Sequence, residues 1–344
     1  MKVWRDDANR GPRNAGSGAE PPPATPIPEG EAGRHGHGEE IHAHMEAHPH
    51  TRGSAGAPSV GIVGAGPVGL ALGVAISRAG WHVAAVSSRN EDRRERFREM
   101  VPGVRAFIDP VAVVDEAELT ILTVPDDAIP GVAASLRLYS GQVLVHTSGL
   151  LGSEVLQPAL AAGSQIGAFH PLVSFTSDTA AAVAALRGAT IALEGDDRAI
   201  GLLADLAEAI GGIPVRLPPG SKPAYHAAAV LASGGLIALL DAIVALGAVA
   251  GMDERGALTV YGRLIEQTMA NARTVGVRAA LTGPITRGDS GTLEAHVAAL
   301  ERFAPEVVEL YLAAARREVR LADERGTLSP HQLERVLAAL AKPA

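Results

Sequence analysis

The alternation of hydrophobic and polar positions changes its period near residue 220. Before that point, short apolar runs alternate with segments of helical period, which is typical of a parallel sheet covered by helices on both faces. From Lys222 onward the helical period continues, interrupted only by short turns. We therefore predict an α/β chain, with a doubly wound, mostly parallel sheet over 58–219 and an all-helical domain over 220–341.

Eight apolar runs have the length and the flanking turns of strands. They cover 59–63, 82–86, 104–108, 118–124, 141–146, 165–169, 190–194 and 213–217. Helical segments lie between most of them. The first ends near residue 78, and the others cover 90–99, 110–116, 128–136, 153–162 and 197–210. Because parallel strands need such crossovers, this order supports the predicted sheet.

A glycine motif follows the first strand and opens the first helix. In Gly64-x-Gly66-x-x-Gly69, the first glycine makes a tight turn, the second lets the backbone approach a pyrophosphate, and the third lets the helix pack closely on the strand. The N–H groups at the start of the helix favour an anion there. The motif predicts a Rossmann-type dinucleotide site formed by Gly64, Ala65, Gly66, Pro67, Val68 and Gly69.

The end of the second strand favours NADP over NAD. An NAD enzyme carries an acidic residue there for the ribose 2′-hydroxyl, but this chain has Ser87-Ser88-Arg89. Two hydroxyls and a guanidinium suit a 2′-phosphate, which Arg89 can bind with two charge-assisted hydrogen bonds. The alternative is that Arg89 only begins a solvated helix, 90–99.

Further candidate residues follow the carboxyl ends of later strands, where ligands of such sheets bind. We expect Val124, Pro125, Asp126 and Thr147 to lie beside the nicotinamide ribose. Two aspartate pairs, Asp126/Asp127 and Asp196/Asp197, precede predicted helices, so we interpret their side chains first as helix caps.

Four polar side chains are candidates for the chemistry. Ser148 and His170 follow two consecutive strands, and Pro171 fixes the exit of the chain after His170. Lys222 and His226 are four residues apart near the start of the long helix, so both can lie on one face of it. Lys222 can bind a carboxylate or donate a proton, and His170 titrates near neutrality. The alternative is structural, with a packed His170 and a solvated helix start.

The composition narrows the classes of function. The 344 residues are 47% hydrophobic, which is enough for two domains with sizeable cores. A net charge of −8 and an aromatic content of 3% disfavour nucleic-acid binding, which needs a positive surface and stacking rings. The absence of cysteine excludes disulfides and thiolate metal sites, and is compatible with a cytoplasmic location.

The first 57 residues are rich in Gly, Pro, Ala and charge, and have no apolar period, so we predict an unfolded tail. Half of the twelve histidines lie in it, as the pairs His35/His37, His42/His44 and His48/His50. Such pairs can hold a divalent metal loosely. We predict a solvated extension and no functional metal site.

The segment 227–252 is long and apolar enough to cross a bilayer. Asp241 lies at its middle, however, and half of its residues are Ala or Gly, which contribute little to insertion. A helix that is apolar all round can also be buried in a core or in a subunit interface. We predict burial of this kind and no membrane span.

Three motifs together resemble one family. Gly167-Ala-Phe-His-Pro-Leu-Val-Ser-Phe175, Lys222-Pro-Ala-Tyr-His-Ala-Ala-Ala229 and Leu281-Thr-Gly-Pro-Ile-Thr-Arg-Gly-Asp289 look like Rossmann-like oxidoreductases with a C-terminal domain of unknown function 2520. The resemblance covers 59–321. It implies a build similar to pyrroline-carboxylate reductase and the hydroxyacid dehydrogenases, with a 6-phosphogluconate-dehydrogenase-like helical domain that forms homodimers.

The resemblance also implies an activity. Some members of the family are regarded as an alternative ketopantoate reductase that uses NADPH. Ser148 and His170 resemble positions of prephenate dehydrogenases, and Lys222 with His226 resembles the Lys-x-x-x-Asn of hydroxyacid dehydrogenases, although His replaces Asn. Ser233-Gly234 likewise stands where Ser-Asn is expected.

We therefore expect a cytoplasmic NADPH-dependent reductase of a small 2-oxo acid such as ketopantoate. His170 or Lys222 would donate the proton, Ser148 would hold the substrate, and His226 would assist. Arg287 and Asp289 would close the pocket, from this subunit or its partner. The alternatives are a prephenate-like dehydrogenase with His170 as base, and a protein that binds NADPH without catalysis.

Overall fold

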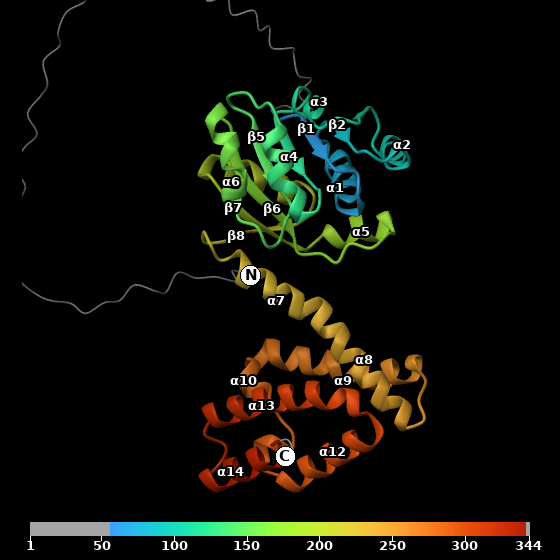
Figure 1. The fold of residues 1–344 in the computed structure, drawn as a ribbon, viewed down its shortest axis with the longest axis vertical. Helices are drawn as coiled ribbons and strands as arrows, with labels where there is room; N and C mark the ends of the chain where they lie inside the picture. The colour runs from blue at the N-terminus through green and yellow to red at the C-terminus, as the bar shows by residue number, and fades with distance from the viewer. Residues whose placement is uncertain (1–55, 342–344) are drawn as a thin grey trace, which may run out of the picture. The chain divides into compact units, whose positions relative to one another are not determined.

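A computed structural model describes residues 56–341 of the chain (Figure 1). The three His-x-His pairs lie outside the described residues, so the predictions for the tail and its histidines stay predictions. The described part begins just before the first strand and contains a sheet region followed by helices.

The sheet has eight strands in the order β3-β2-β1-β4-β5-β6-β7-β8. All neighbouring strands are parallel except β6 and β7, which are antiparallel. The strands are β1 Val60–Val63, β2 Val83–Ser87, β3 Arg105–Phe107, β4 Leu119–Leu122, β5 Val143–His146, β6 Gln165–Pro171, β7 Thr190–Gly195 and β8 Ile213–Arg216. The predicted mostly parallel α/β fold is confirmed.

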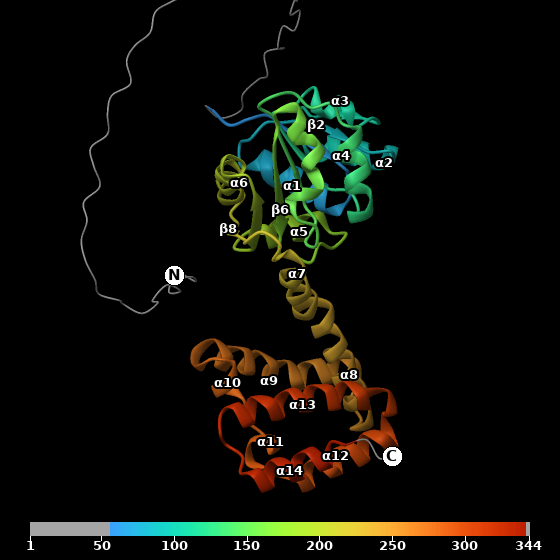
Figure 2. The same ribbon diagram turned by 60° about the vertical axis from the view of Figure 1, so that its left-hand side comes forward.

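Helices cover both faces of the sheet (Figures 1 and 2). Every residue of β1, β4 and β5 is buried, as expected for parallel strands that are covered on both sides. The helices of this region are α1 Pro67–Arg78, α2 Glu91–Met100, α3 Val111–Val114, α4 Ile129–Ser135, α5 Thr179–Leu186 and α6 Asp197–Ala209. One core contains side chains of α1, α2, α5 and α6, and a second contains side chains of α3 and α4.

Two short 3₁₀ segments also belong to the sheet region, η1 Asp126–Ala128 and η2 Ser153–Ala162. The second was predicted as an ordinary helix at the same residues. Pro158 lies inside η2 and has no N–H for a helical hydrogen bond, which accounts for the irregular winding. Helix α5 had no counterpart among the predicted segments.

The helical region begins with one long run that contains α7 Lys222–Val230, the π-helical turn η3 Leu231–Gly235 and α8 Leu236–Val249. By length and composition this run could cross a membrane, and none of its most apolar window is buried. The prediction that it is buried in the core of the chain is therefore wrong. Its burial in a subunit interface stays a prediction.

The remaining helices are α9 Glu254–Val275, α10 Val277–Ala280, α11 Pro284–Arg287, α12 Ser290–Phe303, η4 Pro305–Val307, α13 Val308–Glu324 and α14 Pro330–Ala339. Apolar side chains of α11, α12, α13 and α14 form a core of their own. The predicted helical C-terminal region is confirmed.

Candidate functional site

The glycine turn after β1 has the geometry that the motif predicts. Gly64 has a φ of +111°, which favours glycine, and a Cβ there would lie 2.7 Å from the Thr123 carbonyl oxygen. A Cβ at Gly69 would overlap the carbonyl oxygen of Gly64, so α1 can begin this close to β1 only without a side chain. The Thr123 hydroxyl donates a hydrogen bond of 2.6 Å to the Gly64 carbonyl and fixes the turn.

The turn fits a dinucleotide. A Cβ built on Gly66 meets no atom within 4 Å, so the backbone at the start of α1 is open to a ligand. Pro67 occupies the first turn of α1, where its missing N–H is not needed. Backbone N–H groups at this helix end can therefore face a pyrophosphate, as the sequence predicts.

The three residues that were predicted to bind a 2′-phosphate lie at the end of β2 and differ in how exposed they are. Ser87 is buried within the strand, Ser88 is half-buried, and Arg89 is exposed in the loop. Asn90 caps α2 by accepting a hydrogen bond of 2.9 Å from the Arg93 N–H, so Arg89 lies outside the helix. Binding of a 2′-phosphate by Arg89 stays a prediction.

The interpretation of the two aspartate pairs as helix caps is wrong. The Asp126 carboxylate accepts a hydrogen bond of 2.7 Å from the Ser148 hydroxyl and does not cap η1. Asp196 is the N-cap residue of α6, but its carboxylate accepts from the Ile166 N–H at 3.2 Å. Asp197 forms an exposed ion pair with Arg216. Asp126, Asp196 and Asp197 each have a more distant partner that local sequence does not reveal.

His146 holds the loop that follows β5. Its ring is fully buried, and its Nδ1 accepts a hydrogen bond of 3.2 Å from the Ser148 N–H. Nδ1 therefore carries no proton, and Nε2 donates to the Gly152 carbonyl at 3.0 Å. Burial and the nearby Lys222 lower the pKa of His146 to about 4, so the ring is neutral at pH 7. A neutral imidazole thus ties together both ends of the loop 148–152.

The Ser148 hydroxyl lies within this loop and has a full set of partners. It donates to Asp126 and accepts from the N–H groups of Leu150 and Leu151, at 3.1 and 3.0 Å. The side chain is buried. Direct binding of a substrate by Ser148 stays a prediction, and its observed partners give it a role in shaping the loop.

Lys222 joins α7 to the same loop. Its side chain is 1% exposed, and Nζ donates a hydrogen bond of 2.5 Å to the Ser148 carbonyl oxygen. Burial lowers the pKa of Lys222 to about 8, while the carboxylates of Glu194, Asp126 and Glu154 act to raise it. The ammonium group is therefore still charged at pH 7, and it lies beneath Ser148 rather than in solvent.

Gly149 is the point at which the histidines meet. A Cβ at Gly149 would lie 2.8 Å from Nε2 of His170 and would overlap Nδ1 of His226. The two rings are 6.0 Å apart and nearly perpendicular. The Tyr225 hydroxyl lies 3.3 Å from Nδ1 of His170. Burial, then Lys222 and His226, lower the pKa of His170 to about 4, so His170 is not the protonated acid that its ordinary pKa suggests.

The structure thus brings together Ser148, His170, Lys222 and His226, all of which the sequence indicates. It adds His146 and Tyr225, which sequence reasoning did not select. Tyr225 is three residues after Lys222, and this helical spacing is the signal that could have identified it.

The motif residues Arg287 and Asp289 have local roles in the described chain. Asp289 caps α12 by accepting from the N–H and the hydroxyl of Thr292, at 3.1 and 2.7 Å. The Arg287 carbonyl accepts from the side-chain amide of Gln332 at 3.1 Å, and its side chain is exposed. Closure of the pocket by these two residues stays a prediction.

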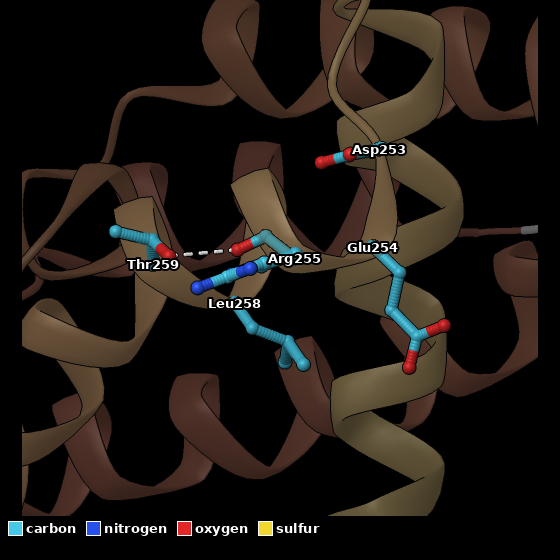
Figure 3. A pocket seen from close by; sticks show the side chains of 5 residues that line it. All are labelled: Asp253, Glu254, Arg255, Leu258 and Thr259. Carbon is cyan, nitrogen blue, oxygen red and sulfur yellow. Dashed lines mark hydrogen bonds between the residues drawn. The ribbon is translucent and has the colours of Figure 1, made fainter.

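A hollow of about 540 Å³ lies elsewhere, at the turn between α8 and α9 (Figure 3). Its lining residues are Asp253, Glu254, Arg255, Leu258 and Thr259. Asp253 caps α9 through the Gly256 N–H, and the Thr259 hydroxyl donates to the Arg255 carbonyl at 2.7 Å. Asp253 and Thr259 thus stabilise the helix, and none of the lining residues belongs to the group around Gly149.

Comparisons with known families agree with this architecture. Residues 47–171 match a Rossmann-like domain, and residues 189–318 match a domain of unknown function, DUF2520. The chain carries both domains. The predicted combination is therefore confirmed. A search of curated proteins finds no match to the chain.

Solved structures show the same fold. Protein TM1727 from Thermotoga maritima is 28% identical, with a TM-score of 0.60 over 77% of this chain and 99% of that chain. A pyrroline-5-carboxylate reductase from Coxiella burnetii is 17% identical, with a TM-score of 0.52 over 78% and 98%. An imine reductase from Aspergillus terreus, in complex with NADPH4 and dibenz[c,e]azepine, is 20% identical, with a TM-score of 0.59 over 80% and 98%. The predicted similarity in build to pyrroline-carboxylate reductase is confirmed.

Substitutions of His146 test its two hydrogen bonds. His146→Asn keeps an acceptor for the Ser148 N–H but is too short to reach the Gly152 carbonyl. His146→Gln can donate to the Gly152 carbonyl but loses the acceptor for Ser148. His146→Leu loses both hydrogen bonds. Because an unsatisfied buried group costs about 1–3 kcal/mol, we expect each amide variant to lose about that much unfolding free energy and leucine to lose more. Urea unfolding at pH 7 measures this. A leucine variant as stable as the wild type would contradict the assignment.

Proposed function

We propose that this protein is an NADPH-dependent reductase of a small substrate with a polarised C=O or C=N bond. The observation that carries the proposal is the convergence of His170, Tyr225, His226 and Lys222 on the loop at Gly149. This loop follows β5, and β5 lies two strands from β1 in the sheet. The carboxyl ends of these parallel strands share one edge, so the group lies on the edge that carries the glycine turn.

The residues for the cofactor follow from the turn and the loops beside it. Gly64 to Gly69 would face the pyrophosphate, and Ser88 with Arg89 would bind the 2′-phosphate. Val124, Pro125, Asp126 and Thr147 would lie along the nicotinamide ribose. When bound, NADPH supplies the hydride for the reduction. The domain assignment that goes with this proposal is cofactor binding by 58–219 and substrate binding and dimerisation by 220–341.

Residues of the chain would supply the proton and hold the site in place. The substrate carbon gains the hydride, the C=O or C=N π pair moves to the oxygen or nitrogen, and that atom gains a proton. Lys222 is the proposed proton source, because its pKa of about 8 keeps it charged at pH 7, whereas His170 is neutral there. Ser148, His146 and Asp126 hold the loop in place.

Two substrate classes fit this chemistry. The resemblance of the sequence motifs favours a 2-oxo acid such as ketopantoate. The similar solved structures include a pyrroline-5-carboxylate reductase and an imine reductase, and their names favour a cyclic imine. The loss of NADPH absorbance with a panel of 2-oxo acids, cyclic imines and prephenate distinguishes these classes. Tight NADPH binding with no turnover on any of them would overturn the proposal in favour of a non-catalytic NADPH-binding protein.

The proposed role of Lys222 predicts a pH dependence. Since the acid must be protonated, kcat/KM should fall about tenfold per pH unit above pH 8, where Lys222 loses its proton. Lys222→Met should lower the rate about 10²- to 10⁴-fold and abolish this decline. The dissociation constant of NADPH, measured by fluorescence, serves as the control for folding and should stay within about twofold. An unchanged alkaline decline in the variant would contradict the role.

The exposed apolar surface of the helical region supports the proposed homodimer. Apolar side chains of α8 and α9 that are exposed include Leu236, Ile237, Leu239, Val249, Leu258, Val260, Leu264 and Met269. So much exposed apolar surface on two adjacent helices needs a cover, because such patches are rarely left in water. A second copy of the chain would present the same helices and could bury both sets.

A charge placed on this surface tests the dimer. Ile237 is 65% exposed, and Ile237→Asp would place a carboxylate in the interface, so we expect a dimeric wild type and a monomeric variant in sedimentation velocity. Leu337→Asp on α14, where Leu337 is 47% exposed, is the matched control and should remain dimeric. A wild type that stays monomeric at all concentrations, or that partitions into lipid vesicles, would contradict the dimer.

A further inference from the structure

Tyr225 and His170 form a pair that the proposed chemistry has not yet used. The Tyr225 hydroxyl lies 3.3 Å from Nδ1 of His170, and the two rings meet edge to face with centroids 5.7 Å apart. Both side chains are half-buried. Tyr225 lies one helical turn after Lys222, whose bond to Ser148 fixes the start of α7. The hydroxyl is therefore held at the side of the His170 ring that faces away from Gly149.

The chemistry of the two groups decides the direction of this hydrogen bond. A phenol is a stronger acid than a neutral imidazole N–H, and an imidazole nitrogen is a better acceptor than a phenol oxygen. Burial also raises the pKa of Tyr225, which keeps the proton on its oxygen. The favoured arrangement is therefore donation by the Tyr225 O–H to an unprotonated Nδ1.

We propose that Tyr225 locks His170 in the neutral tautomer that carries its proton on Nε2, so that His170 donates a hydrogen bond to the substrate and does not act as a base. This inference rests on the proposed reduction. The resulting N–H would bind the oxygen or nitrogen that becomes electron-rich as the hydride arrives.

The surroundings of Nε2 suit this role. Nε2 lies on the Gly149 side of the ring, where the missing side chain leaves the backbone close to both histidines. Nδ1 of His226 is buried there without a hydrogen-bond partner among the described residues. The gap between Gly149 and the two rings is too narrow for another atom, so a substrate atom that accepts from His170 would approach Nε2 from beside the Gly149 backbone.

A neutral donor also agrees with the charges around the ring. Lys222 and His226 lower the pKa of His170, and Asp126 opposes them only in part. Neutral imidazoles can polarise a carbonyl in this way, and one such donor is worth about 10²- to 10³-fold in rate. His170 keeps its proton throughout, so the proton in the product comes from Lys222.

The tautomer can be measured without turnover. In a long-range ¹H–¹⁵N NMR spectrum of protein labelled with ¹⁵N-histidine, assigned by comparison with His170→Gln, we expect wild-type His170 to show a protonated Nε2 and an unprotonated Nδ1. In Tyr225→Phe, which keeps the ring but removes the hydroxyl, the resonances should shift towards a mixture of the two tautomers. A protonated Nδ1 in the wild type, or identical spectra of the two proteins, would overturn the lock.

The chain contains a matched control for this experiment. His296 and Tyr311 form a similar pair on α12 and α13, with Nδ1 2.9 Å from the hydroxyl and perpendicular rings 6.0 Å apart. Tyr311→Phe should change the resonances of His296 and leave those of His170 unchanged. It should also leave kcat unchanged, because no atom of this pair lies in the group around Gly149.

Kinetics then tests the consequence for catalysis. Tyr225→Phe should lower kcat about tenfold through the misplaced Nε2 proton, while the dissociation constant of NADPH stays within about twofold. Unchanged kcat in Tyr225→Phe would overturn the role of the lock in the reaction. If the wild type shows the expected tautomer but reduces no substrate in the panel, the proposed function fails and the lock itself is supported.

Discussion

The candidate site depends on one buried hydrogen bond, from Nζ of Lys222 to the carbonyl oxygen of Ser148. Burying an ammonium group costs several kcal/mol unless partners compensate for the lost water. Here one carbonyl accepts directly, and the carboxylates of Glu194 and Asp126 lie near enough to stabilise the charge. This hydrogen bond fixes how α7 is rotated about its axis, and where it lies along that axis, relative to the loop after β5. Because Tyr225 and His226 are on the first turns of the same helix, their positions relative to His170 follow from this bond.

The loop that contains Ser148 is itself held by three polar side chains from strands or strand ends, of which His146 and Glu194 are buried and Asp126 is exposed. His146 ends β5, Asp126 follows β4, and Glu194 lies in β7, where its carboxylate accepts from the Ser153 N–H at 3.0 Å. The register explains how they meet, since His146 pairs with Ala168 and Ala168 pairs with Glu194. The small Ala168 between them leaves room for both larger side chains on one face of the sheet. Because several side chains hydrogen-bond to this loop, it can hold Gly149 in one conformation, as a preorganised site requires.

The sequence was informative where the signal is local and periodic. The glycine motif identified the turn before α1 because a side chain at Gly64 or Gly69 would clash with the adjacent backbone. Apolar runs identified the strands because consecutive strand residues are buried. It failed where a side chain finds a distant partner. Asp126 looked like a cap but bonds to Ser148, 22 residues away, and Tyr225 meets His170 across 55 residues. The antiparallel β7 was not predicted, because a buried strand has the same apolar pattern in either direction.

The charges of the site explain why the lysine and the histidines should have different chemical roles. Lys222 and the imidazoles of His146 and His170 compete for protons within one buried region, and each additional positive charge there raises the electrostatic cost of the next. Lys222 keeps its charge because carboxylates surround it, and that charge lowers the pKa of both imidazoles. Near neutral pH Lys222 is therefore charged, and the rings of His146 and His170 are neutral. An ammonium group can transfer a proton, whereas a neutral ring can only donate or accept a hydrogen bond in a fixed direction. The proposed roles, Lys222 as the proton source and a neutral histidine as an oriented hydrogen-bond donor, thus follow from one lysine whose charge is stabilised by carboxylates and which lies close to the histidines.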